Sequence, residues 1–363
     1  MQLPLLANWN KLLRCSQVRL DYFLVRNPLS FVLEMLSKAS EIHNHIAAIP
    51  SDQDFSDPAT FTWLPFPSLL DVPNRFTRTE SDVVHFQYMG RSKFRDLKKC
   101  SQEPHFANSS ERLYVYGTSG SGKSHILAAF VCNLIHTGHR VVYIPDCFRL
   151  LENPAWILWC ALVFAFHESE DLNVIRDRND INSLVAFTLR YPNLYVIVDQ
   201  RNALEVGDRK GEHADRKMTI LAWLDEMKMS HRYIYSASAN EISSQDANQT
   251  QSGIAVFEVL GGMTQVSLMY LRIVSSVDVS QEETAQWFFH HQARIPVLSA
   301  NERLSVEHLT GNIPLLLNCL IDAKAFNEEE FMSTRVLRKV NDDVATFFRR
   351  KENELRDLES RNL

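Results

Sequence analysis

Short apolar runs alternate with stretches of helical spacing through the middle of the chain. Four runs have the length and the β-branched or aromatic content of buried strands: 112–117 (RLYVYG), 139–146 (HRVVYIPD), 194–200 (LYVIVDQ) and 232–240 (RYIYSASAN). Helical patterns separate them: from 124 to about 136, after Asn153, and from about 217 to 229. Strands separated by helices are typical of βαβ units, so the sequence predicts an α/β fold with a parallel β-sheet flanked by helices.

The two ends of the chain carry different patterns. Residues 1 to about 50 show helical spacing, whereas 50–80 are rich in proline and turn formers and predict an irregular wrap or linker. Helical spacing returns after about residue 265. Three parts are therefore predicted: a mostly helical or irregular N-terminal extension (1–80), a core (81–265), and a helical lid with a C-terminal amphipathic helix (266–363).

Composition narrows the class of protein. Of the 363 residues, 45% are apolar and 23% are charged, which is ordinary for a soluble globular protein. A formal net charge of −6 argues against nucleic-acid binding by the whole chain, although Arg349, Arg350 and Lys351 offer a local alternative contact for DNA. The six cysteines are scattered without C-x-x-C spacing and predict reduced thiols, not a zinc site.

Neither a membrane span nor a secretory signal is predicted. The first twenty residues lack a basic region followed by an apolar core. The longest apolar run, 155–166, is too short to cross a bilayer, and Asn153 followed by Pro154 is a good start for a core helix. We therefore expect an intracellular protein without membrane contact.

A phosphate-binding loop is the strongest motif. Residues 117–124, GTSGSGKS, match G-x-x-x-x-G-K-[ST] between a predicted strand and a predicted helix. Small residues let the backbone N–H groups surround a phosphate, and the following helix favours anions at its N-terminus. The expected nucleotide-binding residues are Gly117, Thr118, Ser119, Gly120, Ser121, Gly122, Lys123, Ser124 and His125. Lys123 is expected to reach the β- and γ-phosphates of ATP, and the Ser124 hydroxyl to ligate Mg²⁺.

The run 194–200 ends in an acid that suits the second anchor of a metal. Asp199 is predicted to hold Mg²⁺, partly through water, together with Ser124. One strand lies between the loop and Asp199 in sequence, and from this we expect the acid strand to pack beside the loop strand. Gln200 follows where a catalytic carboxylate would activate water; it can orient water but cannot accept its proton, which predicts slow hydrolysis. Glu205 and Asp208 are the alternative acids.

The next strand, 232–240, ends in polar residues where a γ-phosphate sensor would lie. Asn240 is the predicted sensor, with Ser236 and Ser238 as neighbouring alternatives. Four arginines are candidate fingers that the sequence does not rank: Arg209, Arg216, Arg232 and Arg272. His290 and His291 have no partner at metal-binding spacing, so we expect them to be structural. The segment 309–317, LTGNIPLLL, predicts a turn followed by a helix start.

The motifs resemble the P-loop NTPase domain of Crinkler effector proteins, which is related to the retrotransposon hot spot proteins. The resemblance covers about 80–320 and rests on VYGTSGSGKSHILAA, RVVYIPDC, VDQRNAL, SASAN and, more loosely, VLGGMT. That family writes its acid strand D-Q-x-N-A-L, which Asp199, Gln200 and Asn202 match. LTGNIPLLL also resembles the G-x-P turn of STAND and AAA+-like ATPases, where a helical lid begins.

The resemblance implies an ATP-binding and hydrolysing domain. In the family it lies between a secretion or trafficking header and a toxin-like nuclease or kinase module, in effectors that reach a host or own-cell nucleus. Here no header-like β-rich domain is predicted before residue 80, and about 40 residues follow the predicted lid. The leading hypothesis is thus a slow ATPase switch.

Two other classes of function stay open. One is an inert ATP-bound module that binds a protein partner, or itself, through the N-terminal extension or the C-terminal helix. The other is a DNA-dependent ATPase or a nuclease-associated protein.

Overall fold

A computed structural model describes most of the chain in two compact units. Its described residues are 28–102, 112–117, 120–176, 178, 180–191, 194–205, 214–238, 254–258 and 277–338. The first unit contains the residues up to Tyr116 together with Lys123–Glu258. The second contains Gly117–Gly122 together with the residues from Val259 onward. The described part of the predicted N-terminal extension, 28–80, belongs to the same unit as the sheet.

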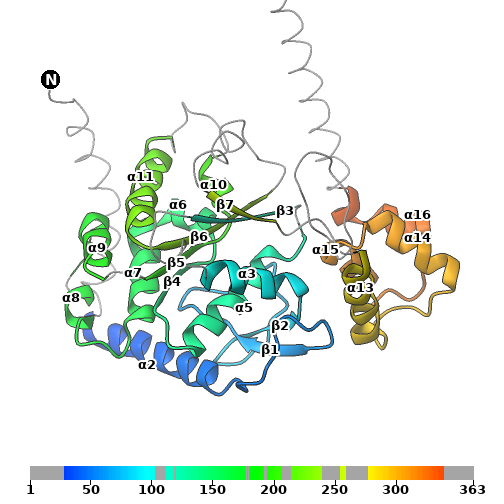
Figure 1. Ribbon diagram of the computed structural model, residues 1–363, viewed down its shortest axis with the longest axis horizontal. Coiled ribbons are helices and arrows are strands. Elements are labelled where there is room, and N and C mark those ends of the chain that lie inside the picture. The colour runs from blue at the N-terminus through cyan, green and yellow to red at the C-terminus, as the bar shows by residue number, and fades with distance from the viewer. Residues whose placement is uncertain are drawn as a thin grey trace, which may run out of the picture. The chain divides into compact units, whose positions relative to one another are not determined.

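A five-stranded sheet with the order β4-β5-β6-β3-β7 forms the centre of the first unit (Figure 1). Its strands are β3 (Arg112–Gly117), β4 (Val141–Ile144), β5 (Tyr195–Val198), β6 (Arg232–Ser238) and β7 (Ile254–Glu258). The β4–β5, β5–β6 and β3–β7 pairs are parallel. Every residue of β4 and β5 is buried, as expected for parallel strands covered on both faces. The predicted α/β fold with a parallel sheet is confirmed, whereas β7 was not among the predicted strands.

The predicted position of the acid strand is wrong. β5, which leads into Asp199, pairs with β4 and β6, so β6 lies between it and the loop strand β3. Sequence order misleads here because β4, which intervenes in sequence, lies at the sheet edge, while β6, which comes later, enters between β5 and β3. Asp199 is therefore next to the carboxyl end of β6.

Helices cover both sides of the sheet, with α5 and α11 on opposite sides in Figure 1. The helices of this region are α5 (Lys123–His136), α6 (Cys147–Glu152), α7 (Pro154–Ala165), α8 (Leu172–Arg176), α9 (Ile181–Thr188), α10 (Asn202–Glu205) and α11 (Ala214–Ser230). α5 and α7 pack against β4, and α10 and α11 pack against β6. As predicted, α7 begins with Pro154, and the Asn153 side chain accepts the N–H of Trp156 at 3.3 Å. Nothing among the described helices combines the length and apolar character needed to cross a membrane.

The N-terminal layer is built on α2 (Pro28–Ala47), which packs against α5, α7 and β1. β1 (Phe61–Pro65) and β2 (His85–Met89) form an antiparallel pair, and α3 (Ser92–Gln102) follows. The predicted irregular stretch 50–80 has no helix, as expected, but 61–65 form β1. The proline-rich segment 66–84 between the two strands is not a solvated linker. Its apolar side chains are buried: Phe66, Leu69, Leu70, Val72 and Phe76. Because these side chains are buried, the segment 66–84 is packed into the core of the first unit.

The described part of the second unit is helical. It contains α13 (Val277–His291), α14 (Ala300–Thr310), α15 (Pro314–Leu317), the 3₁₀ helix η2 (Asn318–Leu320) and α16 (Glu328–Met332). Ser299 and Glu302 form a capping box at the start of α14, and Gly311 ends that helix with a φ of 54°. Pro314 then opens α15, so the predicted turn and helix start are confirmed. Of the predicted C-terminal helix, residues 335–338 are described and are helical, whereas the rest, including Arg349–Lys351, lies outside the described residues.

Buried histidines predict an acid-sensitive first unit. Burial lowers the pKa of His231 from 6.5 to about 4, and burial with the nearby His167 lowers the pKa of His43 to about 4. The unfolded chain therefore takes up protons before the folded one, so the free energy of unfolding should hold above pH 6.5 and fall as the pH drops from 6.5 to about 4. Denaturant titration at several pH values measures this dependence.

The matched variant is His231→Leu. Both ring nitrogens of His231 are buried without a hydrogen-bond partner, so an apolar side chain leaves no group unsatisfied. Its stability should fall less steeply with acid, by up to about 1.4 kcal/mol per pH unit. An acid slope equal to that of the wild type would contradict the assignment.

Candidate functional site

Asp199 is the centre of a polar network at the carboxyl end of β5. The residue is 0% exposed, and its N–H donates to the Ile144 carbonyl of β4 at 2.9 Å. The Ser236 hydroxyl of β6 donates to Oδ1 of Asp199. An aspartate in such a buried position needs hydrogen bonds or a counter-charge, because an unpaired buried carboxylate is very costly. The strand order supplies a hydrogen-bond donor, because it places β6, which carries Ser236, beside β5.

The Ser236 hydroxyl also fixes the backbone after Asp199. It accepts the N–H of Gln200 at 3.1 Å, and the Ser236 carbonyl accepts the N–H of Arg201 at 2.8 Å. Gln200 has a φ of 59°, in the left-handed region that side-chain-bearing residues rarely adopt. Such a conformation costs on the order of 1–3 kcal/mol and persists only when neighbours hold it. The bonds to Ser236 provide that hold at the position where the sequence predicts the water-orienting residue.

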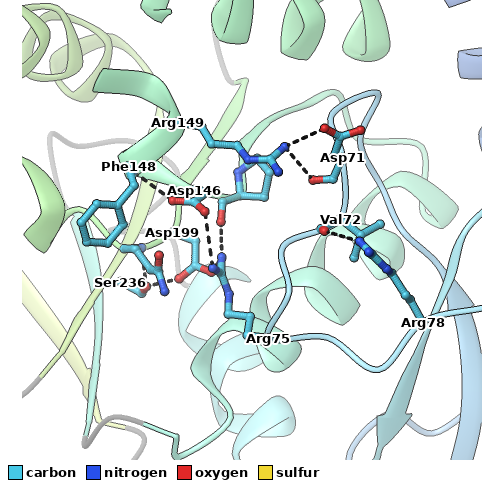
Figure 2. A network of polar contacts seen from close by, with 11 residues as sticks. Asp71, Val72, Arg75, Arg78, Asp146, Phe148, Arg149, Asp199 and Ser236 are labelled. Atoms are coloured by element: carbon cyan, nitrogen blue, oxygen red, sulfur yellow. Dashed lines mark hydrogen bonds and ion pairs between the residues drawn. The ribbon is translucent and has the colours of Figure 1, made fainter. Parts of the chain in front are cut away.

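Arg75 is the cation that neutralises Asp199, and the sequence analysis missed it. Figure 2 shows its guanidinium between Asp199 and Asp146. Nη2 lies 3.0 Å from Oδ2 of Asp199 and donates to the Pro145 carbonyl, and Nη1 lies 3.7 Å from Oδ2 of Asp146. Arg75 comes from the proline-rich segment, 124 positions before Asp199 in sequence. No spacing or motif could have indicated this pair, because only tertiary packing brings it together.

Lys123 begins α5 and is buried, with 9% of its surface exposed. Burial lowers the pKa of its ammonium group to about 8, and the nearby Asp199 carboxylate opposes that shift. A lysine that is desolvated and close to a carboxylate is arranged to meet an anion, since it has few water contacts to give up. The half-buried Ser124 follows it on α5. Lys123 therefore lies close enough to Asp199 for the carboxylate to affect its pKa.

The surroundings of this network are apolar. The His125 ring lies 4.5 Å from the Phe76 ring, and burial and the positive charge of Arg75 lower its pKa to about 4. The Tyr143 pKa is raised well above its usual value by burial and then by Asp199. His125 is therefore neutral and packs against the segment that carries Arg75. The low-polarity setting strengthens every charge interaction within the network.

Two glycines of the predicted phosphate loop have a backbone in the region of positive φ. Gly120 and Gly122 have φ values of 84° and 94°, which glycine adopts at little cost. A Cβ on Gly120 would also meet the Leu315 Cβ at 2.5 Å, and the Leu315 N–H donates to the Gly120 carbonyl at 3.4 Å. Side chains are therefore excluded at Gly120 by both conformation and space. Of the other loop residues, Thr118 and Ser119 lie outside the described residues.

Two of the predicted arginines have partners other than Asp199. Arg216 donates to the Leu151 carbonyl at 3.0 Å. Arg232 donates to the Tyr195 hydroxyl at 3.1 Å, and both residues begin their strands, at the opposite end of the sheet from Asp199. Ser238 ends β6, and Glu205 ends α10. Four predicted residues lie outside the described part: Asp208, Arg209, Asn240 and Arg272.

In the described ranges, no group of three His, Cys, Asp or Glu residues is arranged to hold a metal ion. His290 and His291 end α13, and their neighbourhood is aromatic, with the His291 ring 4.7 Å from Trp287. No protein-family model matches the sequence, and no curated protein matches it.

Replacing Ser236 with alanine should destabilise the fold. The variant leaves Oδ1 of Asp199 and the Gln200 N–H without their buried partner, which should lower the free energy of unfolding by about 1–3 kcal/mol. Denaturant titration gives this difference. The control is Ser230→Ala, at an exposed position on α11, which should change stability by less than about 0.5 kcal/mol. Equal effects of the two substitutions would contradict the role assigned to Ser236.

Proposed function

We propose that this protein is a P-loop NTPase that binds ATP with Mg²⁺ and hydrolyses it slowly, as a nucleotide-dependent switch of the Crinkler type. The observation that supports this most is a buried lysine close enough to a buried aspartate to interact with it electrostatically, at the carboxyl end of a parallel sheet. Lys123 belongs to the full motif Gly117–Ser124, and Asp199 follows β5. Open α/β sheets bind ligands at this end of their strands.

The residues present fit a magnesium nucleotide. Gly120 and Gly122 provide positive φ angles for a loop whose N–H groups bind phosphate. Ser124 and Asp199 offer a hydroxyl and a carboxylate, the oxygen ligands that Mg²⁺ prefers, with water completing its shell. When bound, Mg²⁺ would neutralise charge that develops on the phosphoryl oxygens. Lys123 would add its positive charge at the phosphates, where burial strengthens its effect.

Gln200 determines the expected rate. Its side-chain amide can hold a water by hydrogen bonds but cannot remove a proton, and the loss of a general base costs about 10²–10⁴ in rate. Its backbone is held by Ser236, so the side chain starts from a fixed point next to Asp199. This combination favours a site that positions water and turns over slowly. The same observation favours a second candidate, a module that binds ATP without hydrolysing it.

Partners and location follow from the proposed switch. Effectors of the resembled family act in a host or own-cell nucleus, and we propose a protein partner or self-association as the target of the switch. The N-terminal layer is one candidate surface, since α2 packs directly on α5, the helix that Lys123 begins.

Turnover and binding assays test the proposal. The wild type should bind ATP and release phosphate slowly in the presence of Mg²⁺, whereas Lys123→Ala should lose at least about tenfold in affinity because the charge at the phosphates is removed. The control is Lys99→Ala, an exposed lysine on α3, which should leave both quantities unchanged.

Gln200→Glu separates the two candidates. A slow wild-type enzyme that the carboxylate accelerates by about tenfold or more supports the switch, since a general base is restored. Tight binding without any wild-type turnover supports the inert module. Stimulation of turnover by DNA would favour the DNA-dependent alternative, and absence of ATP binding in the wild type would refute the proposal.

A further inference from the structure

The Asp199 carboxylate already has a partner on each oxygen. Oδ1 accepts the Ser236 hydroxyl, and Oδ2 lies 3.0 Å from the Arg75 guanidinium. The side chain of Asp199 is only 1% exposed, so water does not share these positions freely. The Ser236 hydroxyl that binds Oδ1 also accepts the backbone N–H of Gln200. Oδ2 is therefore the oxygen that would turn to a metal, and a cation from the protein occupies it.

Several acceptors hold the Arg75 guanidinium in place. Its guanidinium donates to the Pro145 carbonyl as well as to Asp199, and it lies 3.7 Å from Asp146 (Figure 2). Asp146 is itself fixed as the N-cap of α6, where it accepts the Phe148 N–H at 2.9 Å. Charge-assisted bonds of this kind are stronger and shorter than neutral ones. The arginine thus binds the site as an ion would, with one monodentate carboxylate and one backbone carbonyl.

We infer that Arg75 takes the place of the metal in the nucleotide-free protein and must leave Oδ2 of Asp199 when Mg²⁺-ATP binds. The inference rests on the proposed function, since it concerns the same site. A guanidinium and a divalent cation at one carboxylate oxygen repel each other strongly in surroundings of low polarity. Arg75 and Lys123 already place two positive groups at Asp199. Free Mg²⁺ is excluded, whereas Mg²⁺ that arrives with phosphates brings the negative charge that both cations need.

The exchange also has a structural consequence. Arg75 lies in the middle of 66–84, and Val72, Asn74 and Arg78 of this segment line a cavity of about 400 Å³ together with Lys38 of α2. Neighbouring contacts anchor the segment: Arg78 donates to the Val72 carbonyl at 2.8 Å, and Arg149 lies 3.1 Å from Asp71. When Asp199 releases Arg75, this segment loses one of its ties to the sheet, the ion pair between Arg75 and Asp199. The nucleotide state is thereby transmitted to the N-terminal layer.

The first test compares Arg75→Gln with Arg75→Lys. Isothermal titration with Mg²⁺ alone should show no binding to the wild type and measurable binding to Arg75→Gln. The Mg²⁺ concentration at half-maximal ATP binding should fall by about tenfold in Arg75→Gln and stay near the wild-type value in Arg75→Lys, which keeps the charge. Arg78→Gln is the control, because it removes a cation of the same segment that does not contact Asp199. Weaker ATP binding with an unchanged Mg²⁺ requirement in Arg75→Gln would overturn the inference.

A second measurement needs only the wild type, so it holds if Arg75→Gln does not fold. Hydrogen–deuterium exchange of peptides covering 70–80 should increase by several-fold with Mg²⁺ and a non-hydrolysable ATP analogue, and should not change with Mg²⁺ alone. Unchanged or slower exchange with the bound analogue would overturn the inference.

The two proposals fail in different ways. If ATP binds with dependence on Lys123 but neither the Mg²⁺ requirement nor the exchange of 70–80 responds, the role of Arg75 is wrong and the nucleotide site stands. If the wild type binds no ATP under any Mg²⁺ concentration, both are wrong.

Discussion

The burial of one negative charge organises this molecule. Asp199 has no exposed surface, so the chain has to supply every partner that water would otherwise provide. Ser236 comes from the neighbouring strand and Arg75 from the N-terminal layer, and Lys123 lies close enough to feel the carboxylate. Three parts of the chain that are distant in sequence therefore come together around this one carboxylate. Breaking a buried pair of this kind by removing one partner is strongly destabilising.

The requirement explains why the proline-rich segment is part of the core. Prolines and turn formers exclude regular structure there, yet Phe66, Val72 and Phe76 are buried. Their packing fixes the backbone on both sides of Arg75. This lowers the conformational entropy that Arg75 loses when its guanidinium binds Asp199. The Phe76 ring also packs against His125, the residue after Ser124 on α5. Apolar burial and charge neutralisation thus support each other at one point of the fold.

Local signals in the sequence predicted much of the fold and part of the site. The helix starts at Asn153–Pro154 and at Pro314 and the strand before Asp199 depend on neighbouring residues, and the structure contains them. What depends on distant residues was not predictable. The placement of β6 between β5 and β3 and the contact of Arg75 with Asp199 are set by tertiary packing, which spacing does not encode. The arginines that were predicted from the sequence lie closer to Asp199 along the chain than Arg75 does. Two of them, Arg216 and Arg232, bind other partners.

The left-handed backbone conformation at Gln200 is independent of the chemical group at the end of its side chain. Its strained conformation is held through its own N–H and through Ser236, neither of which depends on what the side chain carries. Glutamine and glutamate codons differ by a single base, and both side chains have the same length. A lineage could therefore turn a carboxylate into an amide, or restore it, by one point mutation without rebuilding the turn. In the proposed NTPase, the speed of the nucleotide cycle would then be an evolutionarily adjustable trait, while the proposed nucleotide site would be inherited unchanged.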